Sequence, residues 1–205
     1  MLLGVMGLHD FVLDHVCLAL LIRQVDGMLV WVDPEYLDSV THAEFILSAQ
    51  GSHLELSRVV VGTCSIEDNW YDDALRTVNQ IRPDYVIQLS SDEVLDRGFC
   101  EDFVTFVKHK YDAIQCKLDA VTQDGDRRDV THVPPQCVAY RWQEGLHIEA
   151  DTRAVLRRDA TTRALLANCR VHSCKYFTPA LLRAWKQKWH LSREAVYDCW
   201  HDESA

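Results

Sequence analysis

Short apolar runs alternate with amphipathic segments through the first 118 residues, and this alternation restricts the fold more than any other feature. Strands are predicted at residues 2–6, 28–32, 56–62, 85–89 and 111–118, and of these 2–6, 28–32 and 85–89 are short, mostly apolar runs with the length of buried strands. The segments between them have helical character, and they cover residues 11–23, 35–49, 65–81 and 100–110. Strands that alternate with helices through short connections predict an open, mostly parallel α/β sheet flanked by helices.

The remainder of the chain is less regular. Residues 119–135 are polar and end in two prolines, which predicts a loop. Further strands are predicted at 138–142 and 152–157, and a C-terminal helix at 178–189, where Pro179 takes an early helical position. We therefore expect residues 1–175 to form one domain and residues 176–205 to be a C-terminal helical extension of it.

The composition is that of a globular chain. Of the 205 residues, 48 % are hydrophobic and 25 % are charged, which is far from the composition of a disordered protein. No segment reaches the roughly 18 uncharged apolar residues that a membrane span needs. The N-terminus also lacks the basic region and the small-residue cleavage site of a secretory signal. We expect a cytoplasmic protein with no membrane span.

Eight cysteines are scattered along the sequence without a CxxC pair, and most of them lie inside apolar runs. Free cysteine behaves as a small hydrophobic residue, so we interpret these side chains as reduced core thiols. One local group, Cys169, His172 and Cys174, is the alternative, because cysteine and histidine are zinc ligands. The group lacks a fourth ligand and the usual spacing, so a structural zinc site is the less favoured interpretation.

Charge is unevenly distributed along the chain, whose net charge is −10. Residues 1–126 contain 8 basic and 22 acidic side chains, which gives −14, and residues 127–205 contain 13 basic and 9 acidic, which gives +4. A basic C-terminal part is suited to meeting a phosphate-bearing ligand, although the same split also describes an ordinary solvated surface.

Acidic residues follow two of the predicted strands directly. Asp33 comes after the second strand, and Asp92 and Glu93 come after the fourth. In open α/β sheets, ligands bind outside the carboxyl ends of the strands. A pair of acids at that edge suits a hard divalent cation that bridges phosphates, and the alternative is that both side chains cap the next turn.

The run Asp84-Tyr85-Val86-Ile87-Gln88-Leu89-Ser90-Ser91-Asp92-Glu93-Val94-Leu95 resembles the acidic run of family 2 glycosyltransferases with the GT-A fold. Two later segments are also similar to that family: 152–158, which ends in two arginines, and Val171-His172. The resemblance covers about residues 1–175. It implies a nucleotide-sugar-binding and catalytic domain that transfers a sugar from a nucleoside-diphosphate sugar to a hydroxyl acceptor, with inversion and with the help of a metal ion.

The resemblance also implies roles for particular residues. Asp33 would face the nucleobase or ribose of the donor, and Arg157 and Arg158 would lie near its diphosphate or shape the acceptor cleft. A guanidinium suits that task because it can donate two parallel hydrogen bonds to phosphate oxygens.

The metal site that the resemblance implies holds Mn²⁺ or Mg²⁺. Asp92 would be the metal-binding acid with Glu93 beside it, and His172 would approach the metal or the diphosphate from the C-terminal side.

The sequence departs from the family pattern at three places. Ser90 stands where the family has its first metal-site acid, and Ser173 stands where an acid often follows the Val-His pair. The family's Arg-Asn pair in the preceding helix is out of register, with Arg76 and Asn79 as approximate substitutes. The serine at position 90 removes one charge from the predicted metal site.

An inverting transfer needs a carboxylate that takes the proton of the acceptor hydroxyl. Glu144, Glu149 and Asp151 lie in the right part of the sequence, and Glu149 and Asp151 are favoured because they directly precede the arginine-ended strand.

The acceptor is either a saccharide or a hydroxylated base in nucleic acid, such as modified phage DNA. A non-catalytic nucleotide-sugar-binding module is the alternative to an enzyme, and Ser90 favours it. A nucleotidyltransferase on a related scaffold is a third hypothesis, which Gly4 and Gly7 without a following lysine support poorly.

Overall fold

Four parallel strands at the N-terminal end of the chain form one half of a nine-stranded sheet. The computed structural model describes residues 1–8, 11–32, 37–62, 70–90, 93–95, 111–121, 127–129, 136–149, 154–157 and 164–173. The four strands are β1 (Leu2–Leu8), β2 (Gly27–Val32), β3 (Leu56–Val61) and β4 (Tyr85–Ser90), and their order in the sheet is β3-β2-β1-β4. Every residue of β1 and β2 is buried, as expected for central parallel strands covered on both faces.

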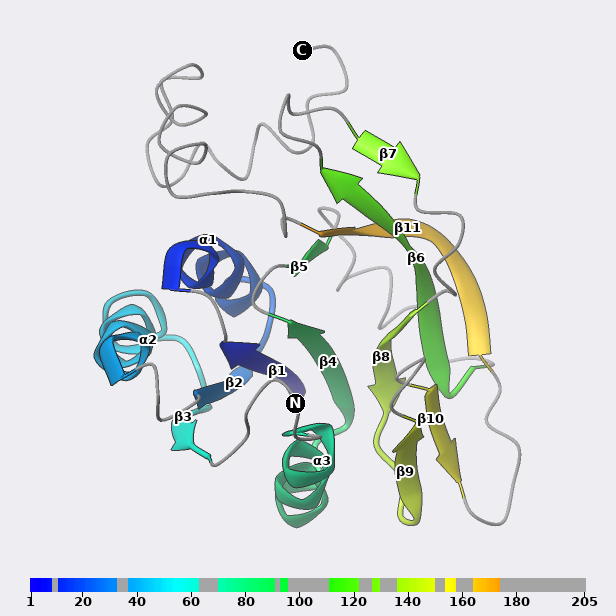
Figure 1. The fold of residues 1–205 in the computed structure, drawn as a ribbon. Helices are drawn as coiled ribbons and strands as arrows, with labels where there is room; N and C mark the ends of the chain where they lie inside the picture. The colour runs from blue at the N-terminus through cyan, green and yellow to red at the C-terminus, as the bar shows by residue number, and fades with distance from the viewer. Residues whose placement is uncertain are drawn as a thin grey trace.

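Three helices cover this half of the sheet on its two faces (Figure 1). They are α1 (Phe11–Ile22), α2 (Leu37–Gln50) and α3 (Trp70–Ile81). The core is accordingly divided in two. Leu18, Leu21 and Ile46 belong to the cluster on the α1 and α2 side, and Trp70 and Val78 belong to the cluster on the α3 side.

The second half of the sheet is built from later strands of mixed direction. They are β5 (Glu93–Leu95), β6 (Ala113–Val121), β7 (Arg127–Asp129), β8 (Gln136–Arg141) and β11 (Ala164–Ser173). The order continues from β4 as β8-β6-β11-β5, with β7 paired to β6. Strands β5, β7 and β8 run antiparallel to the other six, because β8 is antiparallel to both β4 and β6. Two further strands, β9 (Leu146–Glu149) and β10 (Ala154–Arg157), form a separate antiparallel pair.

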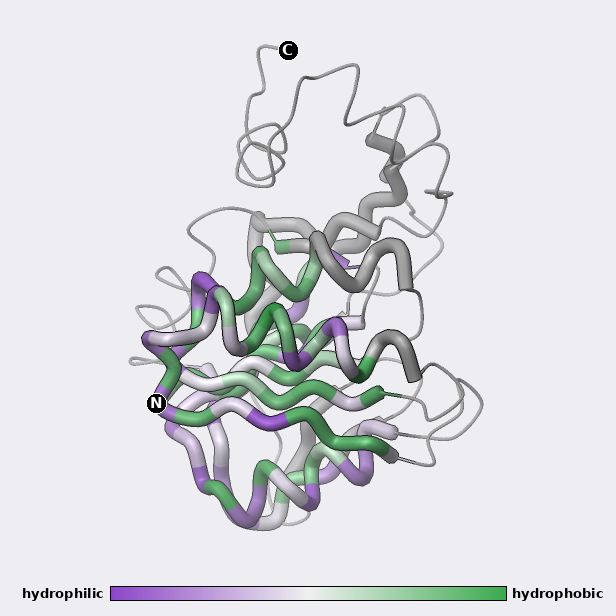
Figure 2. The backbone as a smooth tube through the Cα atoms, turned by 90° about the vertical axis from the view of Figure 1, so that its left-hand side faces the viewer, coloured by the Kyte–Doolittle hydropathy of each residue, from purple (hydrophilic) through white to green (hydrophobic). Residues whose placement is uncertain are grey.

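Hydropathy follows the burial pattern of these strands. In Figure 2 the central strands are largely green, while α2 and α3 alternate between green and purple along their length. Strand β3 is different because it lies at the edge of the sheet and is only partly covered, with Val61 53 % exposed. Because β1, β2 and β4 are strongly buried, the centre of the sheet is rigid, and the segments at its carboxyl edge extend from this rigid centre.

The predicted fold class, a GT-A-like open sheet flanked by helices, is confirmed. One sequence prediction is wrong: residues 119–135 are not all loop, because β6 continues to Val121 and β7 follows at 127–129. The predicted helices at 100–110 and 178–189 lie outside the described residues. Cys17 and Cys116 are buried and form no disulfide, as predicted for core thiols.

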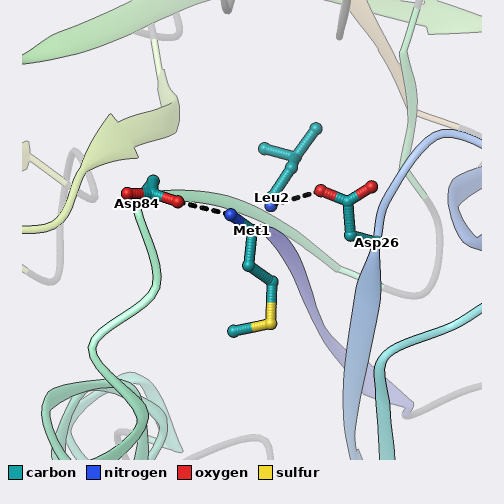
Figure 3. Close-up of polar contacts among 4 residues, drawn as sticks. All are labelled: Met1, Leu2, Asp26 and Asp84. Atoms are coloured by element: carbon teal, nitrogen blue, oxygen red, sulfur yellow. Dashed lines mark hydrogen bonds and ion pairs between the residues drawn. The ribbon is translucent and has the colours of Figure 1, made fainter.

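The start of the chain is held at the opposite, amino edge of the sheet (Figure 3). The ammonium group of Met1 forms an ion pair with Asp84, and the Leu2 N–H donates to Asp26 Oδ2 at 2.8 Å. The hydrogen bond that the Met1 ammonium donates to Asp84 raises the pKa of this amino group above 8.0, and partial burial opposes this effect. These contacts fasten β1 to the segments that precede β2 and β4.

The raised pKa predicts a pH-dependent contribution to stability. A raised folded-state pKa means that the contribution is complete below the unfolded value of 8.0 and is lost as pH rises through the folded value. We expect Asp84→Asn to cost less than about 1 kcal/mol near pH 7, because Asp84 is largely exposed, and to cost less still near pH 10. Urea unfolding at both pH values tests this, with Glu44→Gln, an exposed acid of α2, as the control for lost charge. An Asp84→Asn penalty that grows between the two pH values would contradict the ion pair.

Candidate functional site

The carboxyl edge of the parallel strands is formed by a row of register-matched residues. Gly7 of β1 lies opposite Trp31 of β2 on one side and opposite Ser90 of β4 on the other. Asp33 follows this edge two residues after Trp31, and Asp92 follows it two residues after Ser90. The segments that carry the two predicted ligand acids therefore leave the sheet at the same level.

The first turn of α3 lies over this row. Trp31 Nε1 donates a hydrogen bond to Asp73 Oδ2 at 3.0 Å, and the Tyr71 hydroxyl lies 3.4 Å from Ser90 Oγ. The Trp70 ring is 6.2 Å from the Trp31 ring and 4.3 Å from the Tyr71 ring, measured between centroids. None of these aromatic residues is among the site residues predicted from the sequence. Their signal in the sequence is the pair Trp70-Tyr71 at the start of a helix that packs on the sheet.

Glu93 forms a hydrogen bond with the last residue of β4. Its Oε2 accepts the N–H of Ser90 at 2.8 Å, and the side chain is only 4 % exposed. It lines a narrow crevice with Cys17 and Leu20 of α1 and with Leu95. A buried carboxylate needs such a hydrogen bond, because burial without one is costly.

Strand β11 brings the Val171-His172 segment beside the acidic run. In the antiparallel pairing of β5 with β11, His172 lies opposite Val94 and Ser173 lies opposite Glu93. On its other side, His172 lies opposite Asp119 of β6. Two segments that are far apart in the sequence, and that the family resemblance assigns to one metal site, are therefore adjacent strands of the sheet.

The β9–β10 pair separates the predicted base from the predicted arginine. Glu149 lies opposite Ala154 at the end where the two strands connect, and Arg157 lies opposite Leu146 at the other end. Three residues of an extended strand span about 10 Å, so Glu149 and Arg157 are at opposite ends of the ladder. Leu146 anchors β9 in the core cluster on the α3 side.

Four of the predicted site residues lie outside the described residues: Asp33, Asp92, Asp151 and Arg158. For Glu149, Arg157 and His172 the structure gives the strand position. Among the residues that the structure describes, no group of three or more His, Cys, Asp or Glu side chains could hold a metal ion. Of the predicted ligands, Glu93 has a described side chain, and its carboxylate is a suitable hard donor whose Oε2 already serves the Ser90 N–H.

The zinc alternative and the donor-site hypothesis make opposite claims about His172. Both Cys169 and His172 belong to β11, and the pairing of β11 with β6 shifts register between Leu166 and Arg170. We expect His172→Ala to keep the fold and to weaken binding of a nucleoside diphosphate with Mn²⁺ by at least about tenfold, the scale of outer-shell losses at metal sites. Calorimetry measures the affinity, and circular dichroism checks the fold.

Zinc chelation is the matching control for that prediction. Binding energy at a structural zinc site is folding energy, so chelation or Cys169→Ser would unfold a zinc-dependent protein. We expect neither treatment to do so. Stoichiometric zinc in protein purified without added metal, together with unfolding on chelation, would establish the zinc site instead.

In the part of the chain that the structure covers, no helix is long and apolar enough to cross a membrane.

The architecture is an open, mixed α/β sheet flanked by helices, of the GT-A-like kind. Among solved structures, the chain is similar to a Bacillus anthracis protein described as a glucose-1-phosphate thymidylyltransferase and crystallised in complex with a sucrose. The two chains share 10 % sequence identity and superpose with a TM-score of 0.50, over 94 % of this chain and 97 % of the other. At this identity the likeness shows the fold alone. No family model matches the chain, and no curated protein matches its sequence.

Proposed function

We propose that this protein is a glycosyltransferase that moves a sugar from a nucleoside-diphosphate sugar to a hydroxyl group of its acceptor. The observation that carries the proposal is the pairing of β5 with β11, where the residue after Glu93 lies opposite His172. That pairing assembles, at the carboxyl edge of the sheet, the two segments that resemble the donor site of family 2 enzymes. The GT-A-like fold is compatible with the same chemistry.

The proposed reaction inverts the configuration of the sugar. The acceptor oxygen bonds to the anomeric carbon as the bond from that carbon to the diphosphate oxygen breaks, and Glu149 or Asp151 takes the acceptor proton. The nucleoside diphosphate leaves with the electron pair. Asp33 binds the nucleoside, and Arg157 and Arg158 bind the diphosphate or shape the acceptor cleft.

Asp92 and His172 would hold a divalent cation, Mn²⁺ or Mg²⁺, with Glu93 holding the turn beside them. When bound, such a cation neutralises charge that develops on the diphosphate leaving group. Because Ser90 replaces one acid, the site has one negative charge fewer than the family pattern.

A sugar nucleotidyltransferase is the second candidate, and the likeness to the Bacillus anthracis protein favours it. Against it, β1 ends at Leu8 and α1 begins at Phe11, which leaves two residues, His9 and Asp10, between them. Gly4 and Gly7 lie inside β1. A glycine-rich phosphate loop after the first strand is therefore missing in this part of the described chain.

A substrate panel separates these candidates and the non-catalytic module. Nucleotide sugars with Mn²⁺ or Mg²⁺ are tested for stabilisation of the protein and for release of nucleoside diphosphate, with saccharides and with hydroxymethylated DNA as acceptors. Acceptor-dependent release of nucleoside diphosphate supports the proposal. Release of pyrophosphate from a nucleoside triphosphate and a sugar 1-phosphate supports the nucleotidyltransferase, and stabilisation without turnover supports the binding module.

A further inference from the structure

Strand β1 lies between β2 and β4. In the register of Trp31 and Ser90, the residue of β1 is Gly7, which has no side chain. Trp31, Gly7 and Ser90 form one register-matched row across β2, β1 and β4. Strands lie about 4.8 Å apart, so the outer two residues are about 10 Å apart across the sheet. Gly7 presents only a hydrogen atom between them, and the space on the α3 side of the row is left to residues of α3.

The first turn of α3 contacts both outer residues of the row. Asp73 accepts the indole N–H of Trp31 at 3.0 Å, and the hydroxyl of Tyr71 lies 3.4 Å from Ser90 Oγ. The Trp70 ring lies against the rings of both Trp31 and Tyr71. One helical turn therefore bridges the carboxyl ends of two strands that do not pair with each other.

Ser90 is held from two directions. Its backbone N–H donates to Glu93 Oε2 at 2.8 Å, and its side chain faces Tyr71. Asp73 is similarly divided, because Oδ2 accepts from Trp31 while Oδ1 pairs with Arg76 at 3.0 Å. Ser90, which the bridge contacts, and Asp73, which belongs to it, thus each have a second contact.

We propose that the first turn of α3 is a clamp, formed by Tyr71 and Asp73, that orients the ends of β2 and β4 and, through them, the donor-binding and metal-binding segments. The clamp holds Trp31 two residues before Asp33 and Ser90 two residues before Asp92. The inference rests on the proposed function for the roles of those two acids. Tyr71 and Asp73 are positioning residues, which act through Ser90 and Trp31 without touching the ligand.

Two pairs of variants test the clamp. Tyr71→Phe removes the hydroxyl that faces Ser90, and Tyr85→Phe makes the same change at the amino end of β4 as its control. Asp73→Ala removes the acceptor of the Trp31 indole, and Asp72→Ala removes a neighbouring acid from the same helix turn, so both share any effect of the helix dipole. Asp73→Asn retains an acceptor oxygen and is the rescue variant.

The readouts are the affinity for Mn²⁺ alone, the affinity for nucleoside diphosphates with Mn²⁺, and hydrogen exchange of the Ser90 amide. We expect Tyr71→Phe and Asp73→Ala each to weaken both affinities by about threefold to tenfold, the worth of one hydrogen bond. Exchange at Ser90 quickens in Tyr71→Phe. Both controls keep wild-type affinities, and Asp73→Asn recovers most of the loss.

The outcomes separate the clamp from the proposed function. If the wild type binds Mn²⁺ but no nucleoside diphosphate, the proposed function is wrong, and the Mn²⁺ affinities of the variants still decide the clamp. Faster exchange at Ser90 with unchanged Mn²⁺ affinity would make Tyr71 a structural residue only and overturn the inference. A wild type that binds neither probe overturns both.

Discussion

Asp92→Asn is expected to abolish the joint stabilisation by a nucleoside diphosphate and Mn²⁺ and to lower the rate of nucleoside diphosphate release by at least about 100-fold. Asparagine has nearly the shape of aspartate but lacks the negative charge that a hard cation requires. Ligand at about 100 times its dissociation constant stabilises a folded protein by about 2.7 kcal/mol, and the variant should lose this gain.

Thermal unfolding with each ligand alone and with both together measures the effect. The melting temperature without ligand should stay near that of the wild type, and Glu44→Gln on α2 should behave as the wild type throughout. A normal joint stabilisation in Asp92→Asn would remove Asp92 from the site.

Ile87→Ala is expected to lower the free energy of unfolding by about 2–5 kcal/mol, a large share of the 5–15 kcal/mol typical of a domain. Ile87 is completely buried in the α1-side core, and in β4 it pairs with Gly4 of β1 and with Ala139 of β8. Strand β4 joins the parallel half of the sheet to the mixed half, so the cavity weakens both.

Urea unfolding followed by tryptophan fluorescence and by far-ultraviolet circular dichroism tests this prediction. The two transitions should coincide and shift together, as one cooperative domain over residues 1–175 requires. Val61→Ala, on the exposed edge strand, should change stability by less than about 0.5 kcal/mol. Two separate transitions, with one of them unshifted, would show that the halves fold independently.

The N-terminal half of the fold could be predicted because its strands are buried on both faces. Segment 28–32 is a continuous apolar run and 85–89 is interrupted only by Gln88, which is the pattern of central parallel strands. Strand β11 was missed because Ala164–Ser173 is rich in alanine and leucine and has one β-branched residue. Strand β5 has three residues, which is too short for any periodicity to show. In both cases the neighbouring strands, not local propensity, determine the structure.

The candidate site, too, could be predicted only in part from the sequence. Acids that follow buried strands can be found from the sequence, since strand ends and ligand edges coincide in such folds. The contacts of Tyr71 and Asp73 could not be found from the sequence. They depend on which face of the sheet α3 covers and on where its first turn lies along the strands. The hydrogen bond between Glu93 and the Ser90 N–H could not be predicted either. A metal-binding acid and an acid that accepts a backbone hydrogen bond would be the same residue type in the same position.

The pairing of β5 with β11 also fixes an order of assembly. Strands β1 to β4 find one another within the first 90 residues, and their pairing needs nothing from later in the chain. Proteins emerge from the ribosome N-terminus first, so this half can form while the rest is still being made. Strand β5, by contrast, can pair with β11 only after Val171, His172 and Ser173 have been synthesised. A nascent chain thus carries the paired strands β1 to β4 well before β5 gains its partner, and translation must pass Ser173 for that pairing to form.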